Sequence, residues 1–186
     1  MYFVLFLSVV LIGSVIIIYN SFVRLKNQAN NAWEDINVQL KRRHDLIPNL
    51  VETVKGYATH EKTIFENVAS LRAKATQLND VKESSETENL LAGAIKTIFA
   101  VAESYPLLKA DTNFRQLQTQ LAEVEDQIQY SRRYYNAVVR DMNTKRQMFP
   151  SNIVGSIFKF KELSYFQVNE DERSAIKVEF KGDQNK

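Results

Sequence analysis

The N-terminal segment of the chain is apolar almost throughout. Residues 1–23 contain no Lys, Arg, Asp or Glu, and only small Ser and Gly residues interrupt the run between Tyr2 and Tyr19. An apolar helix of about 20 residues spans the roughly 30 Å hydrocarbon core of a bilayer. Tyrosines at both ends of such a run are typical of the two membrane interfaces. The pattern predicts a transmembrane anchor over residues 1–23.

A cleaved signal peptide is the alternative for this segment. Such peptides carry a basic region before a shorter apolar run, which ends in small residues. Only Met1 precedes the run here, and no small-residue cleavage pattern follows it, so a retained, single-pass anchor is favoured. Arg24 and Lys26 come directly after the run. By the positive-inside rule we expect the N-terminus outside the cell membrane and the remainder of the chain in the cytoplasm.

Four helical segments are predicted beyond the anchor, and the last is the clearest. Between Asn113 and Asn143 the positions of one seam recur at alternating spacings of three and four, as in a coiled coil. Asp111 supplies a capping side chain before this helix, and Pro150 stops the chain after it. The seam consists of Phe114, Leu117, Leu121, Val124, Ile128, Ser131, Tyr135, Val138 and Met142.

The first helix after the anchor continues directly from it. Its apolar residues between Phe22 and Val54 fall on about a third of the helix circumference. Gly56 is predicted to end it, although a seam from Ile47 to Leu78 leaves open one helix running straight through Gly56. A shorter second helix follows. The arc consists of Phe22, Ala29, Ala32, Trp33, Ile36, Leu40, Ile47, Leu50, Val51 and Val54.

A polar stretch, residues 79–88, separates the second helix from the third. Its composition predicts an exposed connection, in which Ser85 and Glu88 have the spacing of a capping box. The third helix then runs from about Leu90 to Ser104, and Tyr105–Pro106 turns the chain.

The fold class predicted is all-α: a transmembrane helix, then an up-down-up-down four-helix bundle with long first and last helices. The bundle covers residues 24–149 and the tail residues 150–186. Because the last helix returns toward the membrane, the tail reaches the bilayer surface, where an aromatic-basic segment can contact lipid or a membrane partner. Equally, the tail can close the open end of the bundle. The candidate residues are Phe149, Ile153, Ile157, Phe158, Lys159, Phe160, Lys161, Tyr165 and Phe166.

The stretch VQLKRRHDLIPNLVETVKGY places charges and a proline inside the first helix. Lys41 and Arg42 project away from the apolar arc, toward water. Arg43 projects into the arc and needs a carboxylate partner if it is buried. In an antiparallel pair of long helices it lies level with about Asp126, where Glu125 flanks the seam of the last helix. We therefore predict an Arg43–Glu125 ion pair that fixes which helices face each other. Pro48 is expected to kink the helix or to start a new turn.

Composition and charge argue against several functions. The net charge of +2 is too small to indicate nucleic-acid binding, and no cysteine is present for thiolate or zinc-thiolate chemistry. The two histidines, His44 and His60, lack the spacing of metal-binding helices. Phosphate-binding and nucleophile motifs are also missing. We expect no catalytic residues, no metal and no cofactor. The basic and aromatic run of residues 132–135 fits packing and lipid headgroups better than nucleic acid.

Several of these motifs together resemble the LemA family. They are the NAW of residues 31–33, the block of residues 38–61 containing RRHDLIPNLV, YPLLKADTNF (105–114), LQTQL (117–121), EDQI (125–128), SRRYYNAVV (131–139) and FPSN (149–152). The resemblance covers nearly the whole chain, and only residues 76–90 carry no recognisable motif. It implies a bacterial single-pass membrane protein with a cytoplasmic four-helix domain, and it implies little about molecular activity.

Two hypotheses of function follow. The first is a non-catalytic, membrane-anchored helical scaffold that binds protein partners at the cytoplasmic membrane. The alternative is a membrane-remodelling or lipid-organising protein that acts through self-association, as a homo-oligomer, and through the aromatic-basic tail.

Overall fold

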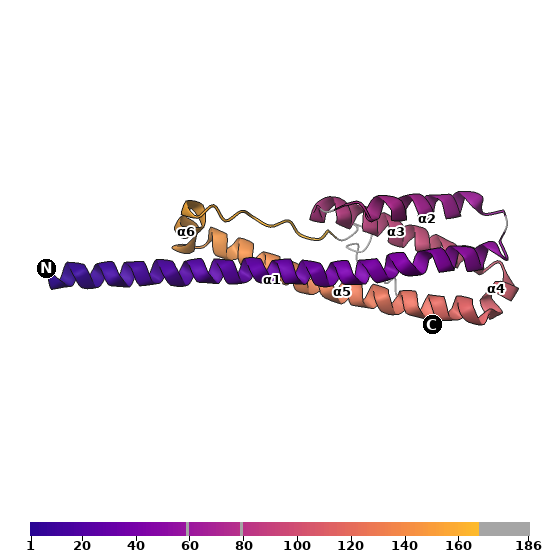
Figure 1. The fold of residues 1–186 in the computed structure, drawn as a ribbon, viewed down its shortest axis with the longest axis horizontal. Helices are drawn as coiled ribbons and strands as arrows, with labels where there is room; N and C mark the ends of the chain where they lie inside the picture. The colour runs from indigo at the N-terminus through magenta and orange to yellow at the C-terminus, as the bar shows by residue number, and fades with distance from the viewer. Residues whose placement is uncertain (59, 79, 168–186) are drawn as a thin grey trace, which may run out of the picture.

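The computed structural model describes residues 1–58, 60–78 and 80–167, and every regular element in these ranges is a helix (Figure 1). The predicted all-α class is therefore confirmed. The elements are α1 (Tyr2–Lys55), α2 (Lys62–Ala75), α3 (Val81–Ala102), α4 (Pro106–Ala110), α5 (Thr112–Gln147) and α6 (Ser151–Ile157). The last positions described, residues 159–167, have no regular structure, and we call them the strap.

The first helix, α1, is a single helix of 54 residues. Its N-terminal part projects alone from the body of the molecule, and its C-terminal part packs against the other helices (Figure 1). The projecting part is long and apolar enough to cross a membrane. The predicted break is confirmed, because α1 ends at Lys55 and α2 begins at Lys62, so one helix through Gly56 is wrong. The predicted arc is buried, apart from the half-buried Trp33.

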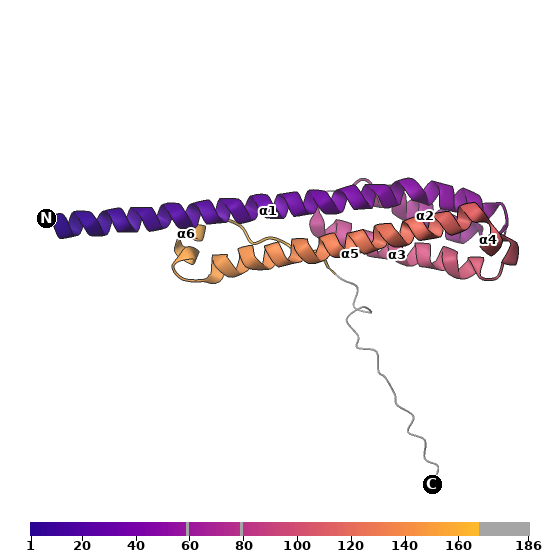
Figure 2. The same cartoon turned by 90° about the horizontal axis from the view of Figure 1, so that it is seen from below.

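Helix α5 lies antiparallel beside α1, and α2 and α3 pack against the distal part of this pair, away from the N-terminus (Figures 1 and 2). A hydrophobic core joins residues of all four helices, including Leu50, Val68, Ile98 and Leu121. The short helix α4 closes the distal end and adds Leu108 to the core. Nearer the N-terminus α2 and α3 are absent, and the strap covers the α1–α5 pair instead (Figure 2).

An exposed connection was predicted for the polar stretch of residues 79–88, and for residues 81–88 this prediction is wrong. From Val81 onward it forms the first turns of α3, because Asp80 caps the helix by accepting hydrogen bonds from the backbone N–H groups of Lys82 and Glu83, at 2.9 and 3.1 Å. The predicted capping box of Ser85 and Glu88 is therefore also wrong. Both side chains lie buried within α3.

Helix α5 follows its predicted seam closely. Asp111 caps it as expected, accepting a hydrogen bond from the backbone N–H of Phe114 at 3.0 Å. The seam residues are buried except Ser131, which is only half-buried. The neighbouring Arg132 is buried instead, because its guanidinium lies over the ring of Phe166 in the strap, 4.7 Å from the ring centroid.

Candidate functional site

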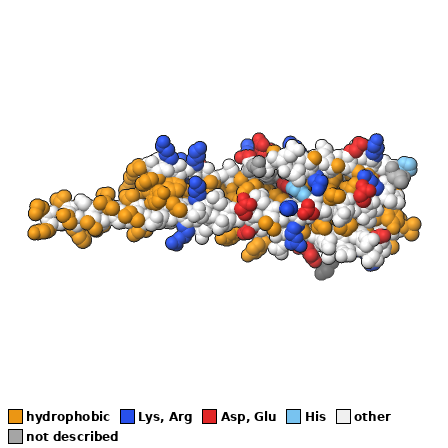
Figure 3. Space-filling view, viewed as in Figure 1, with side chains coloured by type: hydrophobic (Ala, Val, Ile, Leu, Met, Phe, Trp, Pro, Cys, Tyr) orange, Lys and Arg blue, Asp and Glu red, His pale blue; other side chains and the backbone are white. Residues whose placement is uncertain are grey.

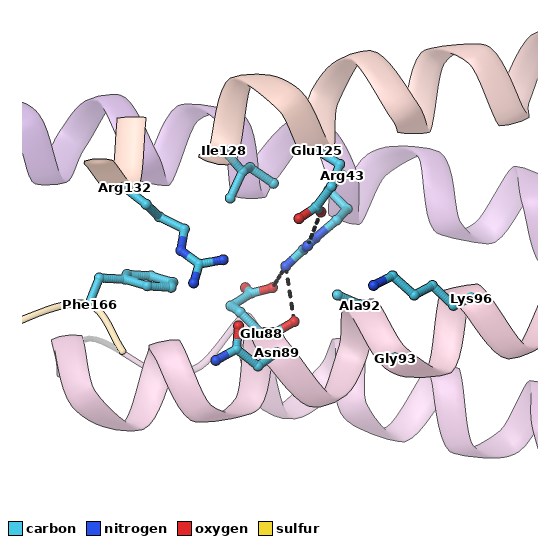
Figure 4. A pocket seen from close by; sticks show the side chains of 10 residues that line it. All are labelled: Arg43, Glu88, Asn89, Ala92, Gly93, Lys96, Glu125, Ile128, Arg132 and Phe166. Atoms are coloured by element: carbon cyan, nitrogen blue, oxygen red, sulfur yellow. Dashed lines mark hydrogen bonds and ion pairs between the residues drawn. The ribbon is translucent and has the colours of Figure 1, made fainter. Parts of the chain in front are cut away.

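Arg43 lies at the centre of a buried ionic cluster formed by Arg43, His44, Glu88 and Glu125 (Figure 4). The side chain turns inward from α1 because it occupies the apolar arc, and it is only 3% exposed. Its Nη2 donates to the Glu88 carboxylate and, at 3.3 Å, to the Glu88 backbone carbonyl. The charge of Arg43 is thus neutralised inside the protein, as burial of a guanidinium requires.

Glu88 is shared between Arg43 and His44. One carboxylate oxygen accepts from Arg43, and the other lies 2.8 Å from His44 Nε2. Burial acts to raise the pKa of Glu88, but the hydrogen bond with His44 and the charge of Arg43 outweigh it and hold the pKa below its ordinary value. Glu88 is therefore an ionised, buried carboxylate that joins α3 to α1.

The predicted contact between Arg43 and Glu125 is present. Arg43 Nη1 donates to Glu125 Oε2 at 2.9 Å, and Gln129 Nε2 donates to the other Glu125 oxygen at 3.1 Å. The Glu125 side chain is 34% exposed, whereas that of Glu88 is 3% exposed. Sequence reasoning found the outer carboxylate and missed the inner one, because it assigned Glu88 to a cap.

Pro48 has a consequence for the carbonyl one turn before it. In an α-helix the carbonyl of residue 44 accepts from the N–H of residue 48, and proline has no N–H. In this structure Arg72 of α2 supplies the missing donor, since its Nε donates to the His44 carbonyl at 2.8 Å. Helix α1 continues through Pro48 to Lys55. The proline therefore creates an attachment point for α2 on α1.

The cluster borders three cavities, of about 50, 230 and 220 Å³. Each is smaller than the roughly 300–1,000 Å³ of ordinary ligand sites. In the described ranges, no group of three or more His, Asp or Glu side chains is arranged to hold a metal ion. The contacts among Arg43, His44, Glu88 and Glu125 connect α1, α3 and α5.

The described tail residues, 150–167, form a second region, at the point where the apolar part of α1 meets the body; residues 168–186 of the predicted tail lie outside the described residues. Helix α6 packs on α1 so closely that a Cβ on Gly155 would lie 3.2 Å from the Phe22 ring. The Phe160 ring stacks on the Phe22 ring with centroids 4.7 Å apart, and the ring centroids of Phe158 and Tyr19 lie 4.8 Å apart. The tail thus reaches the end of the predicted anchor, as expected.

The tail candidates divide between surface and core. Those that remain exposed are Phe149, Ile153, Ile157, Phe158, Lys159, Lys161 and Tyr165. Phe160 is half-buried by its stack on Phe22. Phe166 is 1% exposed and packs among Trp33, Tyr135 and Arg132, so its assignment to a membrane or partner surface is wrong.

Two asparagines of α5 hold the strap in place. Asn143 and Asn136 stand seven residues apart, on one face of the helix. Asn143 exchanges two hydrogen bonds of 2.9 Å with the backbone of Leu163, and Asn136 does the same with Phe166, at 2.9 and 3.0 Å. Each amide matches one backbone N–H and one C=O, as a neighbouring strand would.

Basic side chains gather around the same junction. Figure 3 shows Lys and Arg side chains beside an apolar surface where the narrow N-terminal rod meets the wider body. Arg24 and Lys26 come from α1, and Lys145 and Arg146 from the end of α5. Lys145 Nζ donates to Ser21 Oγ at 2.5 Å, and Arg146 Nε donates to the Phe160 carbonyl at 2.9 Å.

Comparison with known proteins gives a consistent result. A sequence model of the LemA family matches residues 32–180. The chain is 28% identical to Protein LemA of Metamycoplasma hominis over 181 residues, covering 92% of this chain and 80% of that protein. It is 26% identical to Magnetosome protein MamQ 2 of Paramagnetospirillum magneticum over 188 residues, covering 87% and 69%. The identity to Magnetosome protein MamQ of Magnetospirillum gryphiswaldense is 22% over 184 residues, covering 85% and 68%.

Proposed function

Because the chain belongs to the LemA family, whose name states no reaction, we propose from the structure that it is a non-catalytic scaffold anchored in the cytoplasmic membrane. The observation that carries this proposal is the continuity of α1. One unbroken helix of 54 residues is apolar and exposed in its first part and a core helix in its last part. A body joined to its anchor in this way has a set orientation relative to the bilayer.

The remainder of the proposed architecture follows from that helix. Residues 23–55 extend about 50 Å from the anchor, and α2, α3 and α5 pack with the distal part of α1 as an up-down-up-down bundle. The ionic cluster fixes which helices face each other. Exposed apolar residues at the distal end, notably Leu107 at 77% exposure, offer contacts to protein partners.

We place the N-terminus outside and the bundle in the cytoplasm. Arg24 and Lys26 follow the apolar segment, and the fold adds Lys145, Arg146 and Lys159 to the same end of the molecule. Basic residues at this level are attracted by the anionic cytoplasmic leaflet.

Site-specific photocrosslinking in intact membranes tests the scaffold. A photoreactive residue at Leu107 should yield a discrete protein adduct, whereas one at Tyr2, at the far end of the anchor, should yield lipid adducts. Identification of the Leu107 adduct names the partner. Lipid adducts at both positions, or the absence of a protein adduct at every exposed position of α2 to α5, would contradict the scaffold.

One observation favours a second candidate, a protein that organises or remodels the bilayer. The exposed apolar residues Phe149, Ile153 and Ile157 lie beside the end of the anchor, where they can enter the lipid interface. The test is vesicle shape at rising protein-to-lipid ratios, viewed by cryo-electron microscopy. The full chain should deform the vesicles and I153S/I157S should not; equal behaviour would reject this candidate.

A further inference from the structure

A pocket of about 690 Å³ opens where the anchor meets the body. It lies between α1, the end of α5 and the first residues of the strap. Tyr19 and Lys26 line it from α1, and Phe158, Lys159 and Lys161 line it from the chain after α6. Its volume falls within the range of ordinary ligand sites.

The lining is cationic. It contains three lysines, and among the described residues it contains no Asp or Glu. The ammonium groups of Lys26, Lys159 and Lys161 make no hydrogen bond or ion pair with any other described residue. The nearest acidic neighbour along the strap, Glu162, pairs instead with Arg146 at 4.0 Å. Three lysines lining one pocket, with no Asp or Glu among its described lining residues, favour an anionic ligand.

A turn after α6 carries Lys159 and leads to Lys161, which also lines the pocket. Lys159 has φ 55°, in the left-handed region that glycine adopts without steric cost and other residues adopt with some strain. At this turn, the N–H of Phe160 bonds back to the Gly155 carbonyl at 2.9 Å, and the chain reverses from α6 into the strap. Lysine at this position costs backbone stability, so we attribute its presence to the positive charge that it adds to the pocket.

The position of the pocket limits the kind of anion. Tyr19, which lines it, is the last residue of the apolar run, and the exposed apolar surface of α1 continues from there to Tyr2. A ligand that places a phosphate among the lysines can lay acyl chains along this surface. We propose that the pocket binds the headgroup phosphate of an anionic phospholipid. The inference rests on the proposed insertion of residues 2–19 into the bilayer.

Native mass spectrometry of the full-length protein in neutral detergent tests the proposal. The probes are dioleoyl phosphatidylglycerol, dioleoyl phosphatidylcholine and inorganic phosphate. We expect phosphatidylglycerol to bind at least about tenfold more tightly than phosphatidylcholine. The variant K26Q/K159Q/K161Q should lose on the order of 100-fold in affinity for phosphatidylglycerol, since each lysine near an anionic lipid contributes about fivefold.

The matched control is K41Q/K74Q/K82Q, which removes the same charge from exposed lysines far from the pocket. It should bind phosphatidylglycerol as the wild type does. A second test variant, K159G/K161Q, removes two cations from the pocket and places glycine at the left-handed position 159, where it fits without strain. Its affinity for phosphatidylglycerol should fall on the order of 20-fold. Circular dichroism verifies that each variant is folded.

Three results would overturn the proposal: unchanged phosphatidylglycerol binding in both test variants, equal binding of the two lipids by the wild type, or displacement of phosphatidylglycerol by an equal concentration of inorganic phosphate. The last would identify a free phosphate as the ligand. Retention in membranes after an alkaline wash separates this proposal from the anchored scaffold. If the chain stays in the membrane but shows no lipid selectivity, the phospholipid pocket is rejected and the membrane anchor is retained.

Discussion

Arg43 on α1 and Glu88 on α3 form an ion pair in which both side chains are almost completely buried, at 4% and 3% exposure. The pair joins two helices through residues that are 45 positions apart in the sequence. Glu125 of α5 adds a third helix from the edge of the cluster. We regard this cluster as the element that sets the relative register of the helices, because an unpaired charge at this depth is costly in any other arrangement.

Removal of Glu88 should destabilise the protein far more than removal of Glu125. E88A leaves the buried guanidinium without its main partner, at an expected cost of about 3–5 kcal/mol in the free energy of unfolding. E125A removes a half-exposed partner and should cost about 1 kcal/mol or less. Denaturant unfolding of the full chain in detergent measures both, with E86A, at an exposed position of α3, as the control. Equal losses in E88A and E125A would contradict the assignment of Glu88 as the inner partner.

The cluster also predicts acid sensitivity. The pKa of Glu88 is lower in the folded protein than the roughly 4.3 of an unfolded glutamate. The unfolded state therefore binds the proton first, and the stability that Glu88 contributes is present above about pH 4.3 and lost as pH falls through the folded pKa. We expect E88Q to lose less stability than the wild type between pH 6 and pH 3. Parallel curves of unfolding free energy against pH would show that Glu88 has no such role.

Pro48 and Arg72 should be energetically coupled. In the wild type, R72M leaves the His44 carbonyl without a donor, at a cost of about 2 kcal/mol. In a P48A background, the restored N–H of residue 48 supplies the helical hydrogen bond, so the same change should cost much less. A double-mutant cycle by denaturant unfolding measures the difference. An R72M effect of equal size in both backgrounds would mean that the proline and the arginine act independently.

The strap should detach from α5 when the hydrogen bonds of Asn143 are removed. N143A removes a buried side chain and both of its hydrogen bonds to Leu163. We therefore expect the free energy of unfolding to fall by about 2–3 kcal/mol and amide hydrogen exchange at residues 160–167 to become faster. Hydrogen exchange followed by mass spectrometry compares these peptides with those of α2 as an internal reference. If residues 160–167 were as protected from hydrogen exchange in N143A as in the wild type, Asn143 would not be what attaches the strap.

The left-handed residue at the end of α6 gives a prediction of opposite sign. K159G relieves the steric cost of φ 55° and should raise the free energy of unfolding by up to about 1 kcal/mol. K161G, two residues further along, gains no such relief and should lower it by about 0.5–1 kcal/mol. Thermal unfolding of the two variants side by side checks the difference in sign. A loss of stability in K159G would mean that its side chain, and not its backbone, determines the turn.

Periodicity predicted most of the helices because their buried faces are apolar and repeat with the helical period. The arc from Phe22 to Val54 and the seam from Phe114 to Met142 are almost entirely buried. The same reasoning placed Arg43 inside and Glu125 within its reach. Both predictions needed only one antiparallel pair of long helices.

The errors share a physical origin. Ser84, Ser85, Thr87 and Glu88 are polar yet buried. Glu88 pairs with a cation 45 residues earlier in the sequence, and no local pattern records that partner. Phe166 was predicted to lie on the surface because the residues it packs against, Trp33 of α1 and Tyr135 of α5, are distant in the sequence. The strap has no periodicity at all, since asparagine side chains and not a regular element satisfy its backbone.

We propose that α1 runs from the bilayer into the helical body and orients that body along the membrane normal. Since the chain has no cysteine, single substitutions L11C, I153C and L107C can each carry one fluorophore in full-length protein reconstituted into lipid vesicles. Quenchers attached to lipid acyl chains or headgroups then report the depth of each position. We expect quenching by acyl-chain quenchers at residue 11, by headgroup quenchers at residue 153, and by neither at residue 107. Quenching at residue 107 as strong as at residue 153, or none at residue 11, would contradict the account.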